Sequence, residues 1–245
     1  GTGPISFRDS TSPEFYAQER EAVFKRAWLN LCRIEDLPAA GSTLVKPVEA
    51  ADDASVLMVK DAGGRIRAFH NSCRHRGHPL VRDHRPGTVT ELTCGQCGWS
   101  YGLDGALRQV PDVQRYFELD RTAYGLAEIH CDVWAGFVFV NFADEPPQSL
   151  REFLGPMVTA LDDYPFDKLT ERYDWIAHNN SNWKIFADAF QEYYHVPSLH
   201  TQQVPPEVRD PNAGFTCGHF QLDGPHRLVS TAGTRRWLLA PEYMY

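Results

Sequence analysis

The chain has 245 residues, of which 42% are hydrophobic and 23% charged, and its formal net charge is −8. That length accommodates two domains, and that composition supports a sizeable buried core. The acidic balance and the lack of a basic run argue against a nucleic-acid-binding protein, and no apolar stretch approaches the length of a membrane span, so we expect neither a nucleic acid nor a membrane as a partner.

Six cysteines are spread over the chain, too few for this length to indicate a disulfide-stapled scaffold. No secretion signal opens the sequence, so we expect a reducing, cytoplasmic location. Three of the six lie within residues 73–97 beside a histidine, which in such a compartment indicates metal binding. We interpret the other three as small buried core residues: Cys32, Cys131 and Cys217.

Residues 12–28 are predicted to form a helix, since Ser12 suits the N-cap and Pro13 the first helical position. Beyond Pro38 the pattern changes to strands, over residues 42–49, 55–61 and 66–71, the last two joined by an Asp-Ala-Gly-Gly turn. A strand-like stretch over residues 88–94, a hairpin over 99–110 and two strands within 127–142 follow. These residues predict a compact all-β unit with metal-binding loops at one end.

A break at residues 143–148 ends the β unit. The next predicted elements are a helix over residues 149–165 that Pro156 kinks, a strand over 169–178, a helix over 181–196 that Pro197 ends, and a hairpin over 219–230. The expected fold class is α+β. It comprises an N-terminal helical segment of the second domain (1–39), an all-β domain (40–143) and the second domain itself (144–245).

Two short motifs offer candidate metal ligands, Cys73-Arg-His75 and Cys94-Gly-Gln-Cys97. Each tight loop can direct two side chains to one side, and glycines in and after the loops let the backbone approach closely. These four donors are predicted to hold one metal centre.

The pattern resembles the cluster-binding signature of Rieske proteins, in which Cys-x-His and Cys-x2-His hold a [2Fe–2S] cluster, with two thiolates on one iron and two imidazoles on the other. Gly98-Trp99 and the following hairpin resemble those of Rieske oxygenase catalytic subunits. The departure is Cys97, which stands where the family has its second histidine. The resemblance implies four cluster ligands: Cys73, His75, Cys94 and Cys97.

A thiolate at position 97 stabilises the oxidised cluster, so we expect a reduction potential nearer to that of all-cysteine clusters. The same four residues also form a usual structural zinc set. Two alternatives therefore stay open at this point: a non-catalytic zinc-clamped binding module, and an iron–sulfur protein that only transfers electrons.

A second group of candidate ligands reads Glu192-x2-His195-x4-His200. On an unbroken helix a five-residue step turns the two imidazoles about 140° apart. We expect Pro197 to break the helix, so that His200 folds back and shares a metal with His195, as in 2-His-1-carboxylate iron sites.

This segment resembles the Asn-Trp-Lys…Glu-x2-His-x4-His stretch of the Rieske oxygenase catalytic domain, which has a helix-grip fold. The resemblance implies that His195 and His200 bind a mononuclear iron. Glu192 would bridge His195 to the second cluster histidine of a neighbouring subunit, and Asp188 would support it from one turn earlier. The family's third iron ligand is an Asp from a later helix, which we expect to lie beyond this sequence.

A metal-bound thiolate has no proton to donate to Glu192, so we expect Cys97 to impair electron delivery. The resemblance implies O2-dependent hydroxylation or demethylation of a small organic substrate, an aromatic compound being the first expectation. It implies a [2Fe–2S] cluster and mononuclear Fe(II), with electrons from NAD(P)H through a reductase and in some members a ferredoxin. A homotrimer or an α3β3 assembly is the implied oligomer.

Overall fold

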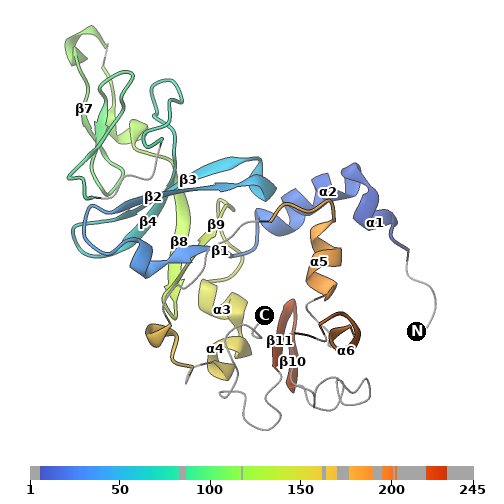
Figure 1. Cartoon of the computed structure of the whole chain (residues 1–245). Coiled ribbons are helices and arrows are strands. Elements are labelled where there is room, and N and C mark those ends of the chain that lie inside the picture. Colours follow the sequence, from blue (N-terminus) through green and yellow to red (C-terminus); the bar gives the residue numbers. More distant parts are fainter. Residues whose placement is uncertain are drawn as a thin grey trace. The chain divides into compact units, whose positions relative to one another are not determined.

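Figure 1 shows the computed structural model of the chain, in which residues 6–82, 87–116, 118–161, 164–169, 177–189, 195–200, 202 and 219–230 are described. The chain divides into two compact units. One comprises Ala17–Phe153, and the other combines Gly1–Tyr16 with Leu154–Tyr245. The predicted domain boundaries after residues 39 and 143 stay predictions.

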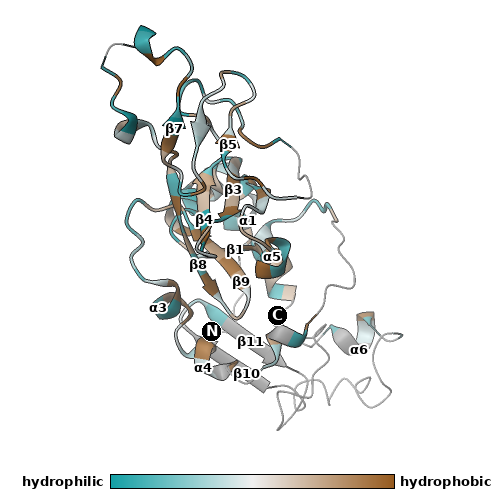
Figure 2. Cartoon of the chain, turned by 90° about the vertical axis from the view of Figure 1, so that its left-hand side faces the viewer, coloured by the Kyte–Doolittle hydropathy of each residue, from teal (hydrophilic) through white to brown (hydrophobic). Residues whose placement is uncertain are grey.

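The first unit is built on a six-stranded sheet with the order β1-β9-β8-β4-β3-β2, in which every neighbouring pair is antiparallel. Its strands are β1 (Leu29–Arg33), β2 (Thr43–Val48), β3 (Ala54–Lys60), β4 (Ile66–His70), β8 (Glu128–Trp134) and β9 (Phe137–Asn141). The predicted hairpin over residues 55–71 is present as β3 and β4, and the two strands predicted within 127–142 are β8 and β9. Figure 2 shows hydrophobic colouring along much of β8 and β9.

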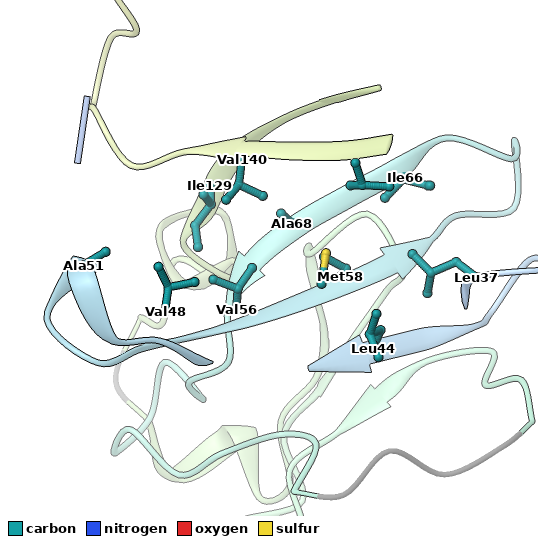
Figure 3. Packing of buried hydrophobic residues seen from close by; sticks show 11 residues of the cluster. Leu37, Leu44, Val48, Ala51, Val56, Met58, Ile66, Ala68, Ile129 and Val140 are labelled. Atoms are coloured by element: carbon teal, nitrogen blue, oxygen red, sulfur yellow. The ribbon is translucent and has the colours of Figure 1, made fainter. Parts of the chain in front are cut away.

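Strand β3 buries both of its faces because alternate side chains enter different cores. Val56 and Met58 belong to a cluster with residues of β2, β4, β8 and β9, shown in Figure 3. Leu57 and Val59 belong to a second cluster, which extends from Phe69 of β4 to the cysteine loops. Strand β3 thereby ties the metal-binding end of the unit to its main sheet.

A three-stranded sheet lies in the insertion between β4 and β8, with the order β5-β6-β7. Its strands are short: β5 (Leu92–Thr93), β6 (Ser100–Tyr101) and β7 (Leu107–Gln109). The predicted hairpin over residues 99–110 is β6 and β7, while only two residues of the strand-like stretch 88–94 pair as β5. In Figure 1 this insertion (teal to green) projects from the six-stranded sheet.

The predicted helix over residues 12–28 is only partly present. The structure has α1 (Arg8–Thr11), α2 (Pro13–Glu19) and a π-helical turn, η1 (Arg20–Phe24). Ser12 caps α2 as expected, because its hydroxyl accepts the N–H of Phe15 at 3.1 Å. The residues after η1 then form β1, an edge strand that the sequence reading missed.

Short 3-10 helices connect the strands of the first unit: η2 (Ile34–Asp36), η3 (Glu49–Ala51), η4 (Val113–Arg115) and η5 (Arg121–Tyr124). The predicted helix over 149–165 is broken rather than kinked. It forms α3 (Leu150–Leu154) and α4 (Pro156–Ala160), with Gly155 between them at φ 52° and Pro156 as the first residue of α4. A further 3-10 turn, η6 (Phe166–Lys168), follows.

The remaining described elements belong to the second unit. They are α5 (Trp183–Ala189), α6 (Val196–Leu199), β10 (His219–Asp223) and β11 (His226–Ser230). The hairpin predicted over residues 219–230 is confirmed, with all five residue pairs in register. Most of the strand predicted over 169–178 lies outside the described residues, as do Phe190 to Tyr194 of the predicted helix over 181–196.

Candidate metal centres

The two cysteine loops close in the same way. The N–H of Gly77 donates to the carbonyl of Cys73 at 2.8 Å, and the N–H of Gly98 donates to the carbonyl of Cys94 at 2.9 Å. Both glycines have φ +73°, a conformation that a Cβ disfavours. At Gly98 a Cβ would also lie 3.0 Å from the ring of Pro111. The glycine after each motif is therefore required by the turn that presents the cysteine.

Asn71 fastens the first loop to the sheet. Its side-chain oxygen accepts the N–H groups of Leu80 and Val81 at 3.0 and 3.1 Å, and its amide nitrogen donates to the carbonyl of Val81 at 2.7 Å and to Ser55 Oγ at 3.2 Å. The residue is buried, so these bonds satisfy a polar group that would otherwise be costly. They hold the two ends of the loop together and position Cys73.

Three thiols converge between the loops. The sulfur atoms of Cys73, Cys94 and Cys97 all lie within 4.8 Å of one another, and the sulfurs of Cys73 and Cys97 are 3.6 Å apart. Cys73 and Cys94 are buried, and Cys97 is half-buried. Among the residues that the structure describes, these three form the one group of potential metal ligands of that size.

His75, the fourth predicted ligand, lies on the first loop but outside this three-sulfur group. Its imidazole stacks on the indole of Trp99, with ring centroids 5.3 Å apart, and meets the edge of Tyr116 at 6.5 Å. Trp99 thus provides the aromatic surface that supports this histidine. The described geometry thus brings three of the four predicted cluster ligands together and places the fourth beside them on an aromatic surface.

The thiols differ in their tendency to ionise. Burial opposes ionisation of Cys94, yet its pKa lies below the ordinary value, because the N–H groups of Gln96 and Cys97 and the neighbouring thiols stabilise its thiolate. Burial raises the pKa of Cys97, although the N–H of Trp99 acts in the opposite direction. Cys94 is therefore the first of the two to become a thiolate.

Tyr101, which the sequence reading missed, contacts the centre directly. Its fully buried hydroxyl lies 3.3 Å from the sulfur of Cys73 and accepts the N–H of Arg74 at 3.1 Å. Burial and the contact with Cys73 raise the pKa of the phenol, so it keeps its proton and is able to donate it to a thiolate at Cys73. The signal was present in the sequence, because Tyr101 lies two residues after Trp99 and side chains at that spacing in a strand share a face.

The second candidate centre is a histidine pair. The rings of His195 and His200 have centroids 5.2 Å apart and planes at 70°, and both residues are half-buried. A metal about 2.1 Å from each imidazole nitrogen would hold two rings with centroids about 5 Å apart, which agrees with this separation. The two imidazoles are therefore close enough to bind one ion.

The turn that brings the histidines together differs from the predicted one. Pro197 does not end a helix but is the second residue of α6, where a proline costs no hydrogen bond. The carbonyl of His195 accepts the N–H of Leu199 at 2.7 Å, and His200 follows directly after that turn.

Two acids were predicted to support this centre, and the structure describes one of them. Glu192 lies outside the described residues, and Asp188 is an exposed residue near the end of α5. Their roles stay predictions. Of the three cysteines assigned to the core, Cys32 and Cys131 are half-buried against the hydrophobic core cluster that contains Met58, and Cys217 lies outside the described residues.

The first unit also has an open cavity of about 920 Å³ away from the cysteine loops. It lies where β8 diverges from β4, whose pairing comprises only Ala68 with Ile129 and Phe69 with Glu128. Arg65, Arg67 and His130 are among its lining residues, and it contains none of the predicted ligands.

The donor set fits a Rieske-type cluster in its chemistry. Such a cluster needs two thiolates on one iron and two further donors on the other. Cys73 and Cys94 are buried thiols from separate loops whose sulfurs converge, and Cys97 and His75 offer a thiolate and an imidazole from the same two loops.

Comparison with known proteins places both candidate centres in recognised domains. Residues 27–129 match the family described as Rieske [2Fe-2S] domain, and residues 166–245 match the ring hydroxylating alpha subunit (catalytic domain). No helix among the described residues is both long and apolar enough to cross a membrane.

Two curated relatives are informative. The chain is 31% identical over 191 residues to the glycine betaine monooxygenase oxygenase subunit of Chromohalobacter salexigens, covering 78% of this chain and 41% of the relative. It is 30% identical over 200 residues to the large oxygenase component of the naphthalene 1,2-dioxygenase system of Pseudomonas aeruginosa, covering 78% and 43%. The chain spans half or less of the length of such relatives, between 41% and 50%.

Solved structures of the same kind share the fold. The quaternary ammonium Rieske monooxygenase CntA with L-carnitine superposes with a TM-score of 0.78 at 20% identity, covering 91% of this chain and 60% of that one. Naphthalene 1,2-dioxygenase with indole gives 0.71 at 24% identity, covering 90% and 52%. With a mixed helix-and-sheet fold, a Rieske domain and catalytic alpha-subunit sequence in one polypeptide, the chain belongs to the large subunits of the Rieske non-haem iron oxygenases.

Proposed function

We propose that the protein carrying this chain catalyses O2-dependent hydroxylation or demethylation of a small organic substrate. The observation that carries the proposal is the presence of two metal-binding arrangements in one chain. Three thiols converge in the part that matches the Rieske domain, and two imidazoles lie 5.2 Å apart in the part that matches the catalytic domain. Neither a zinc-clamped module nor a pure electron-transfer protein needs the second arrangement.

In this proposal Cys73, His75, Cys94 and Cys97 hold the [2Fe–2S] cluster, and His195 and His200 hold the mononuclear iron. The cluster supplies one-electron storage and transfer, and the iron supplies dioxygen activation beside the substrate. The protein's part is to position these groups and keep water away. Burial of Cys73 and Cys94 excludes solvent from one side of the cluster, while Trp99 and Tyr116 orient the imidazole of His75.

Glu192 and Asp188 complete the proposed site as acids that act through His195. Glu192 is three residues before His195, and Asp188 is four residues before Glu192, so on a helix all three share a face. A carboxylate that accepts the ring N–H of a metal-bound histidine fixes the orientation of that ring and raises its basicity. Glu192 would also accept a hydrogen bond from the cluster ligand at position 97 of a neighbouring subunit. A thiolate of Cys97 has no proton to donate in that bond.

The partners follow from the same proposal. Electrons would come from NAD(P)H through a reductase, directly or through a ferredoxin, and O2 would be the second substrate. One of the solved structures of CntA is described as revealing inter-subunit electron transfer. A trimeric arrangement would serve the same purpose here, by bringing the cluster of one subunit to the iron of the next.

Two substrate classes are supported by the relatives. Glycine betaine, carnitine and choline monooxygenases act on quaternary ammonium compounds, whereas anthranilate and naphthalene dioxygenases act on aromatic ones. Hydroxylation of an N-methyl group would release formaldehyde, whereas dioxygenation of a ring would give a dihydrodiol. The two classes are thus separable by product.

The test is a turnover assay of the protein with a reductase, NADH and O2, in which glycine betaine, carnitine, anthranilate and naphthalene are offered separately. We expect substrate-dependent formation of formaldehyde or of a hydroxylated product. His200→Ala should lower that rate at least 100-fold, because one of two imidazole ligands is lost, whereas His178→Ala, at an exposed position, should leave it unchanged. Product formation that survives His200→Ala would contradict the proposed iron site.

Tyr101→Phe tests the hydrogen bond to Cys73 separately. Removing the hydroxyl takes away a donor to a ligand sulfur, and such bonds stabilise the more negative, reduced cluster. We expect a lower reduction potential in an EPR-monitored titration, together with about 1 kcal/mol less stability in urea. Tyr124→Phe is the matched control, since this exposed ring touches the edge of Trp99 at 5.9 Å. Equal potentials for the two variants would contradict the assigned role.

A further inference from the structure

The three sulfurs at the cysteine loops are spaced like the corners of a single tetrahedral metal site. A zinc–sulfur bond of about 2.3 Å separates two thiolates on the same ion by about 3.8 Å. The sulfurs of Cys73 and Cys97 are 3.6 Å apart, and Cys94 completes a triangle whose sides do not exceed 4.8 Å. One ion above this triangle can reach all three.

A two-iron cluster distributes its donors differently. Ligands on different irons lie at opposite ends of the cluster, so a donor on the second iron is kept away from the thiolates on the first. By its place in the motif Cys97 would pair with His75 on the second iron. Instead its sulfur lies beside Cys73, while the imidazole of His75 is stacked on Trp99.

The second loop also has the backbone geometry of a metal-binding turn. The carbonyl of Cys94 accepts the N–H of Gly98 at 2.9 Å, and the N–H groups of Gln96 and Cys97 are directed at the sulfur of Cys94. Backbone N–H groups around a sulfur stabilise a metal-bound thiolate, because they offset its negative charge. Cys94 and Cys97, three residues apart, are thereby presented from one turn toward Cys73 on the other.

We propose that, when the cluster is absent, Cys73, Cys94 and Cys97 bind a single thiophilic divalent ion of the Zn²⁺ class. Each thiol gives up its proton to solvent as its sulfur binds, and water completes the tetrahedron, because the imidazole of His75, stacked on Trp99, lies outside the three-sulfur group. The ion occupies the thiols that the cluster would use, so the two cofactors exclude each other. Cys97 creates this competition, because it adds a third sulfur to a pair.

The site is tested with Co²⁺, which reports thiolate ligation by its absorption. In the chain stripped of iron by a chelator under anaerobic reducing conditions, Co²⁺ should give a sulfur-to-cobalt charge-transfer band that saturates at one Co²⁺ per chain; Co²⁺ bound at His195 and His200 gives no such band. Zn²⁺ should displace the Co²⁺ that gives the band. In Cys97→Ser that band should lose about one third of its intensity, as three thiolates become two, and affinity should fall at least tenfold.

Three further variants keep the test decisive. Cys131→Ser, which removes a half-buried thiol on β8, and His75→Ala should both keep the full charge-transfer band. Cys97→His replaces the third thiolate by the imidazole that the family has at this position. Its charge-transfer band should therefore have the intensity of two thiolates. A charge-transfer band unaffected by either substitution at Cys97, or the absence of such a band in the unsubstituted chain, would overturn the proposal.

Competition with the cluster gives an independent readout. Chain loaded with Zn²⁺ should stay colourless when incubated with iron and sulfide, and should turn brown after the zinc is chelated. Cluster assembly that proceeds equally fast with and without bound zinc would show that the ion lies elsewhere. The oxygenase proposal does not depend on this result, because failure to bind Co²⁺ would leave the product assay untouched.

Discussion

Cys97→His is expected to raise the reduction potential of the cluster by roughly 100 mV or more. That shift is a fraction of the difference between ferredoxin-type clusters, at about −400 mV, and Rieske clusters, at about −150 to +300 mV. The neutral imidazole removes a negative charge from the second iron, and that change favours the reduced state. An EPR-monitored redox titration measures the shift.

The same substitution should speed delivery of an electron to the mononuclear iron. Glu192 would regain a neighbour with an N–H to donate, in place of a thiolate that repels it. Single-turnover kinetics with a pre-reduced cluster would show the acceleration. Gln96→His is the matched control, because it adds an imidazole at an exposed position of the same loop without replacing a donor. A potential that rises without faster iron reduction would remove Glu192 from the electron path.

Gly41→Ala is expected to destabilise the first unit by about 2–5 kcal/mol. A positive φ costs a residue with a Cβ about 1–2 kcal/mol, and an overpacked contact adds about 1–3 kcal/mol. Gly41 has φ +86°, and a Cβ there would press directly on the backbone of Val89. Gly41 N–H donates to Lys60 O at 2.8 Å, and its carbonyl accepts the N–H of Val89 at 2.9 Å, so the new methyl group cannot move away.

Gly64→Ala separates the two contributions. Gly64 has a nearly equal φ of +83°, but nothing lies within 4 Å of a Cβ at that position. Only the conformational cost of about 1–2 kcal/mol should appear in its urea unfolding curve. Equal destabilisation of the two variants would mean that the contact with Val89 relaxes without cost. Because Val89 leads into the second cysteine loop, Gly41→Ala should also reduce cluster loading.

Those parts of the fold that depend on local pattern were predictable from the sequence. Strand β3 and its turn into β4, the pair β8–β9 and the hairpin β10–β11 all combine strand-forming residues with a glycine turn, and all are present. Strand β1 was missed because Leu29–Arg33 is short and directly follows a segment with a helical pattern. It is a strand only by its pairing with β9, which includes an irregularity between Asn30 and Cys32.

The N-terminal helix shows the same limit. Residues 12–28 have a helical pattern, but the chain widens to a π-turn at Arg20–Phe24. Asp52, which lies far along the sequence, receives ion pairs from Arg20 at 2.9 Å and from Lys25 at 2.5 Å. Contacts of this kind depend on tertiary structure, and no local propensity shows them.

For the candidate centres, the sequence indicated which side chains could meet, and the structure shows this convergence for three thiols and for one histidine pair. Spacing alone indicated that Cys73, Cys94 and Cys97 would converge, since each loop is short and glycine-rich. The sulfur of Cys97 lies beside that of Cys73 because of how the two loops pack against the second hydrophobic cluster, which contains Phe69. The position of His75 on Trp99 depends on the same packing. The spacing of residues in the sequence determines which side chains can come together, and the packing of the core determines which of their atoms are in contact.

The brief pairing of β4 with β8 has a mechanical consequence. Along the backbone, the described part of the sheet joins the halves β2-β3-β4 and β1-β9-β8 by two residue pairs and the bond from His70 N–H to Ala127 O at 2.9 Å, and the ion pair of Arg67 with Glu128 at 3.1 Å adds a side-chain contact. This pairing lies at the end of β4 that leads to Cys73, and β4 and β8 are unpaired toward Ile66. Thermal unfolding should therefore begin at the turn between β3 and β4 and reach the metal-binding loops last.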